Sequence, residues 1–156
     1  MFIDSPTPFS FIPDDGLILI AEDREDDILL IRRALQKAGV RNPIQIVRNG
    51  DEAIAYLKGE TKSSSREGCR LPSLLLLDLK MPRMDGFEVL RWIRQQPGLK
   101  ALRVIVLTSS EDIRDVNLAY ELGANSYMVK PMDFDHSVEI CKFLKEYWLR
   151  RARVSR

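Results

Sequence analysis

The side chains of this sequence that could do chemistry follow short apolar runs. Three carboxylates, one hydroxyl and one ammonium group stand at such positions: Glu22, Asp23, Asp78, Thr108 and Lys130. If the apolar runs are parallel strands, their carboxyl ends meet at one edge of a sheet, where α/β proteins bind ligands. We therefore expect these side chains to converge on one crevice.

Carboxylates gathered in one crevice repel one another and need a cation. Ligation by oxygen atoms alone is typical of Mg²⁺, or of Mn²⁺ in its place. Lys130 could neutralise the remaining charge or hold an anion, and Thr108 offers a hydroxyl to the same anion. The set indicates that Asp78 is a nucleophile that forms an aspartyl phosphate, with the metal and the lysine stabilising the transferring oxygens.

Each of these residues has a simpler interpretation when it is taken alone. Glu22 and Asp23 could open a helix in a polar loop. Asp78 could cap the turn after its strand, and Thr108 could cap the next helix. Lys130 could be an ordinary surface lysine. Their joint occurrence at successive strand ends, in chain order, favours a single functional site.

Apolar periodicity supplies the elements that would position the site. It predicts strands at 16–21, 43–47, 74–77, 103–107 and 125–129. Helical spacing and helix-stop residues predict helices at 25–38, 51–58, 85–96, 112–122 and 133–150. Five such units predict an α/β protein with a flavodoxin-like, doubly wound fold. Its five-stranded parallel sheet has the order 2-1-3-4-5 and carries five helices.

Residues 16–150 are expected to form one domain. The proline-containing segment 1–15 is expected to be an N-terminal arm, and 151–156 a basic tail. The polar segment 59–70 has no periodicity and is expected to be a flexible loop.

Composition excludes several classes of protein. A net charge of +1 gives no electrostatic indication of nucleic acid or of acidic membranes. The apolar runs are shorter than the roughly 20 residues that span a bilayer, and the N-terminus lacks the features of a signal peptide. The spacing of Cys69 and Cys141 suits neither a zinc site nor a disulfide framework. We therefore expect a cytoplasmic protein.

The motifs resemble those of the receiver domains of two-component response regulators, from Gly16 to Trp148. They are AED at 21–23, LLLDLKMPRMDG around Asp78, VLTSS around Thr108 and SYMVKP at 126–131. The resemblance implies that Asp78 accepts the phosphoryl group and that Thr108 contacts its oxygens together with Lys130. Glu22 and Asp23 would be the acidic pair, with Asp23 and Asp78 as direct ligands of Mg²⁺.

Three further roles come only from this resemblance. The backbone carbonyl of Lys80 would be the third protein ligand of the metal. Tyr127 would be the aromatic switch residue, although an aromatic at this position can also serve in packing. The peptide bond before Pro131 would be cis.

The resemblance also implies the function. The protein would accept a phosphoryl group from a sensor histidine kinase and signal by conformational change, as a single-domain regulator without an output domain. It would not be an enzyme beyond self-phosphotransfer and slow self-dephosphorylation. The DREDD segment at 23–27 and the KMPRMDG turn resemble stand-alone regulators that partner phytochrome-type kinases.

Two other functions compete with this one. A Mg²⁺-dependent phosphohydrolase of the haloacid dehalogenase type would have a second Asp, the general acid, where this sequence has Lys80. A scaffold receiver without phosphate turnover is disfavoured by the complete set of site residues. His136 has no partner motif, so we expect no phosphoryl-relay role for it.

The last predicted helix has apolar residues over more of its circumference than one core requires. The surplus is assigned to Ile140, Phe143 and Tyr147, which predicts a homodimer or a partner-docking surface. The alternative is that these side chains pack against the N-terminal arm.

Overall fold

A computed structural model of the chain describes residues 16–59 and 71–149. The predicted N-terminal arm, nearly all of the predicted loop and the basic tail lie outside these residues. Five parallel strands form one sheet in the order β2-β1-β3-β4-β5. Their bounds are Ile18–Ala21 for β1, Ile44–Val47 for β2, Leu74–Leu77 for β3, Arg103–Thr108 for β4 and Ser126–Val129 for β5. The predicted fold class and strand order are confirmed.

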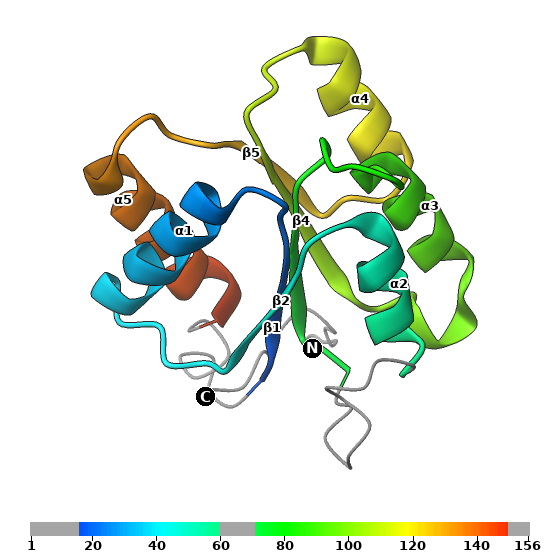
Figure 1. Cartoon of the computed structure of the whole chain (residues 1–156), viewed down its shortest axis with the longest axis horizontal. Helices are drawn as coiled ribbons and strands as arrows, with labels where there is room; N and C mark the ends of the chain where they lie inside the picture. Colours follow the sequence, from blue (N-terminus) through cyan, green and yellow to red (C-terminus); the bar gives the residue numbers. More distant parts are fainter. Residues whose placement is uncertain (1–15, 60–70, 150–156) are drawn as a thin grey trace, which may run out of the picture.

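Helices cover both faces of the sheet (Figure 1). The face with α1 and α5 lies opposite the face with α2, α3 and α4. The helix bounds are Glu25–Lys37 for α1, Gly50–Leu57 for α2, Gly86–Gln95 for α3, Ile113–Glu121 for α4 and Phe134–Leu144 for α5. A 3₁₀ turn, η3 (Pro97–Leu99), follows α3, and a π-helical turn, η4 (Lys145–Leu149), continues α5.

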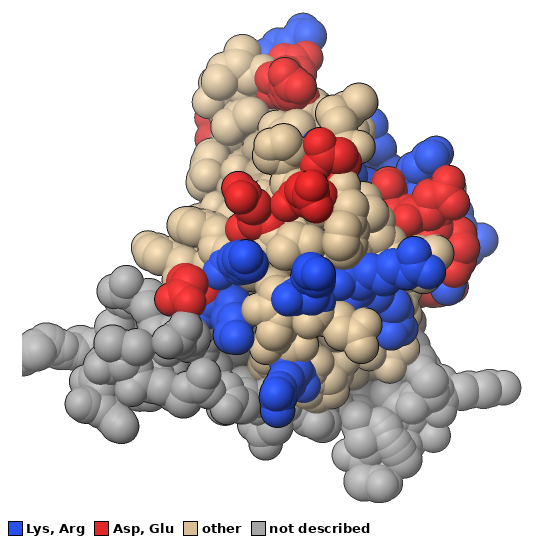
Figure 2. All heavy atoms as spheres, turned by 90° about the vertical axis from the view of Figure 1, so that its left-hand side faces the viewer, with Lys and Arg blue, Asp and Glu red and all other residues tan. Residues whose placement is uncertain are grey.

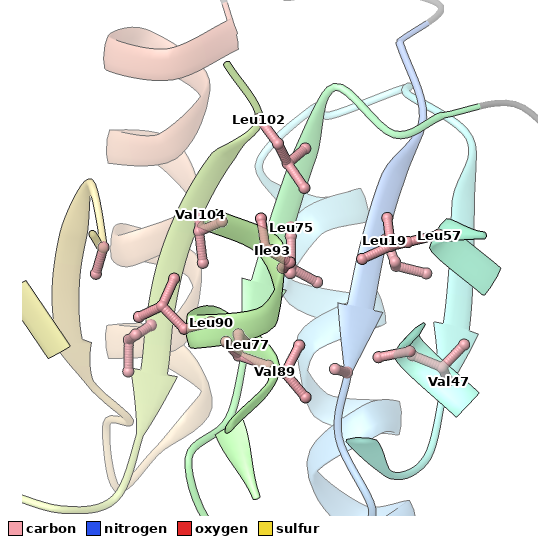
Figure 3. Packing of buried hydrophobic residues seen from close by; sticks show 14 of the residues in the cluster. Leu19, Val47, Leu57, Leu75, Leu77, Val89, Leu90, Ile93, Leu102 and Val104 are labelled. Atoms are coloured by element: carbon pink, nitrogen blue, oxygen red, sulfur yellow. The ribbon is translucent and has the colours of Figure 1, made fainter. Parts of the chain in front are cut away.

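The leucine run of β3 lies at the centre of the sheet and is buried on both sides. Leu75 and Leu77 pack with residues of α2 and α3 (Figure 3). Leu74 and Leu76 point to the other face, where they pack with α1 and α5. Successive side chains of a strand alternate between faces, so a strand covered on both faces needs a continuous apolar run. This requirement explains the four consecutive leucines that precede Asp78.

Carboxylate and amide caps begin four of the helices next to the carboxyl edge of the sheet. The cap side chains accept hydrogen bonds from first-turn backbone N–H groups and belong to Asn49, Asp85, Asp112 and Asp133. Acidic first turns and basic last turns on α1 and α5 complement the helix dipoles. Figure 2 shows the result on the α1–α5 side as acidic residues above a band of Lys and Arg.

Candidate functional site

The carboxyl edge of the sheet brings the predicted chemical residues together. Backbone hydrogen bonds extend beyond the strands here: Glu22 N donates to Val47 O at 3.0 Å and Asp78 N to Ala21 O at 3.1 Å. On the other side, Lys130 N donates to Thr108 O at 2.7 Å. The residues that carry the site are therefore fixed by the same backbone pairing that holds the sheet.

Three carboxylates lie close enough to hold one cation. One oxygen atom from each of Glu22, Asp23 and Asp78 lies within 4.8 Å of the other two. Glu22 and Asp78 are buried, at 4% and 5% exposure, and Asp23 is half-buried. Buried carboxylates need a counter-charge, and an all-oxygen donor set is the one that Mg²⁺ or Mn²⁺ prefers. The three residues fit a divalent cation.

Lys130 supplies a positive charge to the same crevice. Its Nζ lies 2.5 Å from Glu22 Oε1, 2.9 Å from Asp27 Oδ2 and 3.0 Å from Asp78 Oδ2. An ammonium group has three hydrogens to donate, and the three carboxylates use all of them. All three hydrogens of Lys130 are thus engaged with carboxylates.

Burial and their mutual contact shift the pKa values of both Glu22 and Lys130. Burial raises the pKa of Glu22 to about 7, although the hydrogen bond from Lys130 opposes the rise. Burial acts to lower the pKa of Lys130, but the hydrogen bonds to Glu22 and Asp27 prevail and raise it above its ordinary value. Lys130 is therefore a permanent cation, whereas Glu22 can exchange a proton near neutral pH.

Thr108 ends β4 with its hydroxyl inside the protein. The side chain is 0% exposed, and its Oγ1 is one of two buried side-chain polar atoms without a hydrogen-bond partner in the described ranges. Leaving such a group unpaired costs about 1–3 kcal/mol. Thr108 does not cap α4, because Asp112 is the N-cap of that helix. The Thr108 hydroxyl therefore has a hydrogen to donate that no acceptor in the described part of the chain takes.

The loop from Asp78 to α3 is held by two close backbone approaches. A Cβ on Gly86 would lie 2.4 Å from Asp78 O, and a Cβ on Gly50 would lie 2.3 Å from Met84 O. Only glycine permits these approaches. Lys80 lies exposed on this loop, and its backbone N–H donates to Asp78 Oδ1 at 3.3 Å.

Tyr127 connects β5 to the loop after Thr108. Its half-buried side chain donates its hydroxyl hydrogen to Ser110 O at 3.0 Å. Ser110 Oγ in turn donates to Asp115 Oδ2 in α4 at 2.6 Å. The predicted switch residue thus contacts the segment that joins the site to α4.

Two expectations differ from the structure. The peptide bond before Pro131 is trans, as is every peptide bond of the described residues, so the cis expectation is wrong for this structure. Trans is favoured by about 0.5–1 kcal/mol before proline, and the three carboxylates already hold Lys130 without a cis bond. Ile140 does not belong to an exposed surplus, because it is half-buried and packs against the α1–α5 core.

The other two residues of the predicted docking surface are exposed. Phe143 and Tyr147 are 49% and 47% exposed. Their rings are stacked, with centroids 5.5 Å apart and planes inclined by 6°. His136 lies exposed at the start of α5, where its ring nitrogen contacts the cap residue Asp133 at 2.9 Å.

Asp27 is a site residue that strand-end reasoning missed. It lies in the first turn of α1 and takes one of the three hydrogens of Lys130. Asp27 and Lys130 also line a pocket between the sheet and helices α1 and α5, together with Leu30, Pro131 and Ile140. The available signal was its position in the first turn of the helix that directly follows Glu22 and Asp23.

Comparisons with known proteins agree with this geometry. Residues 18–142 match the family model of the response regulator receiver domain. The chain is 38% identical over 136 residues to the probable methanogenesis regulatory protein FilR2 of Methanothrix harundinacea, covering 87% of this chain and 85% of FilR2. It is 36% identical over 140 residues to the response regulator Rcp1 of Synechocystis sp., covering 88% of this chain and 92% of Rcp1.

Solved structures give the same result. The phosphorylated cyanobacterial phytochrome response regulator RcpA superposes with a TM-score of 0.79 at 37% identity, covering 86% of this chain and 94% of RcpA. The Mn²⁺-bound form of Rcp1 has a TM-score of 0.77 at 34% identity, covering 86% of this chain and 95% of that one. None of the helices in the described ranges has the length and apolar character needed to cross a membrane.

Proposed function

The chain belongs to the response regulator receiver family, and we propose that it accepts a phosphoryl group on Asp78 from a sensor histidine kinase. The observation that carries the proposal is the crevice itself. Asp78 Oδ2 lies 3.0 Å from Lys130 Nζ, and the Thr108 hydroxyl at the same sheet edge is buried without a partner. A phosphoryl group on Asp78 would give the Thr108 hydroxyl an acceptor and would add a new acceptor beside Lys130.

The transfer is a displacement at phosphorus. A carboxylate oxygen of Asp78 forms the new O–P bond while the P–N bond of the donor phosphohistidine breaks, and the leaving imidazole nitrogen keeps the bonding electrons and takes up a proton. Lys130 and Thr108 donate hydrogen bonds to the phosphoryl oxygens. These hydrogen bonds would stabilise the negative charge that develops on the phosphoryl oxygens.

Glu22, Asp23 and Asp78 are the side chains that would hold a divalent cation, together with the backbone carbonyl of Lys80. When bound, Mg²⁺ or Mn²⁺ would act as a Lewis acid on the phosphoryl oxygens. The Mn²⁺-bound form of the relative Rcp1 supports this proposal.

Phosphorylation would favour a second conformation of the protein. In that conformer Thr108 moves toward the phosphoryl group, the loop after it follows, and Tyr127 turns inward. The hydrogen bonds of Tyr127 to Ser110 O and of Ser110 to Asp115 would carry this change to α4. The altered surface over α4, β5 and α5 would be what a partner recognises.

The proposal also covers partners and domain bounds. The donor would be a phytochrome-type histidine kinase, because RcpA is a cyanobacterial phytochrome response regulator. Phosphoryl transfer from such a kinase would take place in the cytoplasm, and the receiver domain would be residues 16–150. Beyond phosphotransfer to itself, the protein would catalyse only slow loss of its own phosphoryl group.

The test is the intact mass after incubation with acetyl phosphate and Mg²⁺. The wild type should gain the mass of one phosphoryl group, and omission of Mg²⁺ should prevent the gain. Asp78→Asn keeps the shape of the side chain but should gain nothing. A folded wild type without an adduct would contradict the proposal, and multiple turnover of the donor without an adduct would favour a phosphohydrolase instead.

A further inference from the structure

Asp27 stands apart from the acidic residues that could hold a cation. The set whose oxygens converge within 4.8 Å consists of Glu22, Asp23 and Asp78. Asp27 comes instead from the first turn of α1, where its Oδ2 lies 2.9 Å from Lys130 Nζ and 3.4 Å from Arg24 Nε. Its only contact with the chemistry of the site is through Lys130, as far as the described residues show.

We propose that Asp27 is a positioning residue that holds the ammonium group of Lys130 toward α1 in the unphosphorylated protein. It would compete for this group with the phosphoryl oxygens on Asp78. The inference rests on the proposed function, because it concerns the donor that the phosphoryl group needs.

The competition follows from a count of hydrogens. Lys130 has three to donate, and Glu22, Asp27 and Asp78 take all three. The side chain of Lys130 is only 16% exposed, so water offers little help. A phosphoryl oxygen can gain Lys130 as a donor only when one carboxylate loses it.

Phosphorylation turns the charged Asp78 carboxylate into the uncharged acyl group of an acyl phosphate, so its hydrogen bond from Lys130 passes to the phosphoryl group. Any second hydrogen that Lys130 donates to the phosphoryl oxygens must come from Glu22 or Asp27, and Asp27 gives it up at the lower cost. Its side chain is 29% exposed, whereas those of Glu22 and Asp78 are each 5% exposed. A carboxylate that loses its cation is stabilised by water if it is exposed and destabilised if it is buried. Asp27 also keeps the guanidinium group of Arg24 nearby.

Removal of the Asp27 carboxylate should therefore shift the equilibrium between the free and the phosphoryl-bound state in one direction. Asp27→Asn weakens an ion pair that only the unphosphorylated state makes in full. It also removes a negative charge that repels the phosphoryl group. Both changes favour the phosphoryl-bound state over the free state.

The test measures the affinity for beryllofluoride, a stable mimic of the phosphoryl group on a carboxylate, by ¹⁹F NMR at saturating Mg²⁺. Asp27→Asn should bind beryllofluoride about two- to fivefold more tightly than the wild type, the effect of losing one partly exposed ion pair. Asp27→Ala should bind at least as tightly as Asp27→Asn, and Asp27→Glu should return toward the wild type.

The matched control is Asp26→Asn. Asp26 lies in the same first turn of α1 and is exposed, and the substitution makes the same change of charge. If Asp26→Asn tightens binding as much as Asp27→Asn does, a general charge effect explains the result and the inference is wrong. It is equally wrong if Asp27→Asn leaves the affinity unchanged or weakens it.

Two further readouts separate this role from others. A purely structural role would lower the melting temperature of Asp27→Asn and leave the beryllofluoride affinity unchanged, whereas positioning of Lys130 raises that affinity whatever the change in melting temperature. Failure of the proposed function looks different, because the wild type itself would then bind no beryllofluoride and form no Asp78 adduct.

Discussion

At the scale of single residues, the proton on Glu22 links the site to pH. Burial raises its pKa from 4.5 to about 7, so the folded metal-free protein binds an extra proton between these values. Stability then falls as the pH rises through this window, by up to about 1 kcal/mol per pH unit. Glu22→Gln carries no such proton. In EDTA, the melting temperature of the wild type should therefore fall relative to that of Glu22→Gln as the pH rises from 5 to 6 to 7.

Excess Mg²⁺ provides the control for this prediction. A cation held by Glu22, Asp23 and Asp78 replaces the proton, so the stability gained from Mg²⁺ should grow with pH in the wild type. Parallel pH profiles for the wild type and Glu22→Gln in EDTA would show that Glu22 is ionised throughout, as its 2.5 Å contact with Lys130 favours.

The sequence predicted the residues whose position depends only on strand ends. Glu22, Asp78, Thr108 and Lys130 lie at the sheet edge as expected, because parallel pairing aligns those ends. Asp27 was missed because it reaches the site from a helix, and its contact depends on how α1 packs on the sheet. The roles assigned to these residues remain predictions.

At the scale of elements, Gly86 fixes how α3 starts beside the phosphoacceptor. A Cβ there would lie 2.4 Å from Asp78 O and 2.8 Å from Leu79 Cα. Both are backbone atoms directly after β3, so a shift of either would disturb the end of that strand. Gly86→Ala should lower the free energy of unfolding by about 2–3 kcal/mol, as overpacking does. It should also slow formation of the Asp78 adduct. Urea unfolding and intact mass measure the two effects.

Gly98→Ala is the matched control. A Cβ at Gly98 meets nothing within 4 Å, so this substitution should change stability by less than about 0.5 kcal/mol. Equal losses in the two variants would mean that loss of glycine itself, rather than the contact with Asp78, is responsible.

Element types were predictable because their patterns are local, and element ends were less so. The leucine run and the Asp85 cap define β3 and α3 within one residue of the expected positions. Thr108 was expected after its strand but is the last residue of β4, since pairing with Val129 continues that far. The π-helical turn Lys145–Leu149 has no sequence signal that we recognised, because it depends on packing at the end of α5.

At the scale of the whole molecule, the stacked rings of Phe143 in α5 and Tyr147 in η4 provide an exposed apolar surface. If a second copy covers them, Phe143→Ser with Tyr147→Ser should convert a dimer into a monomer in sedimentation velocity. Burial of two aromatic side chains at an interface is worth a few kcal/mol, enough to change the dissociation constant by about a hundredfold.

Leu29→Ser provides the comparison, because Leu29 on α1 is also 49% exposed. It should leave the oligomeric state unchanged. A wild type that sediments as a monomer with and without beryllofluoride would exclude the dimer and leave a different partner for this surface. The sequence periodicity indicated that this helix has more apolar residues than one core needs. It could not show that Ile140, unlike Phe143 and Tyr147, packs against the α1–α5 core.

The order in which the site residues emerge from the ribosome has a consequence of its own. Lys130 follows Asp78 by 52 residues and Glu22 by 108. At a synthesis rate of about 5–20 residues per second, the acidic residues are therefore made several seconds before their lysine. Because β5 completes the sheet at its edge, a nascent chain would lack the lysine contact proposed for phosphotransfer until its last strand is made. Only a completely synthesised domain could then accept a phosphoryl group.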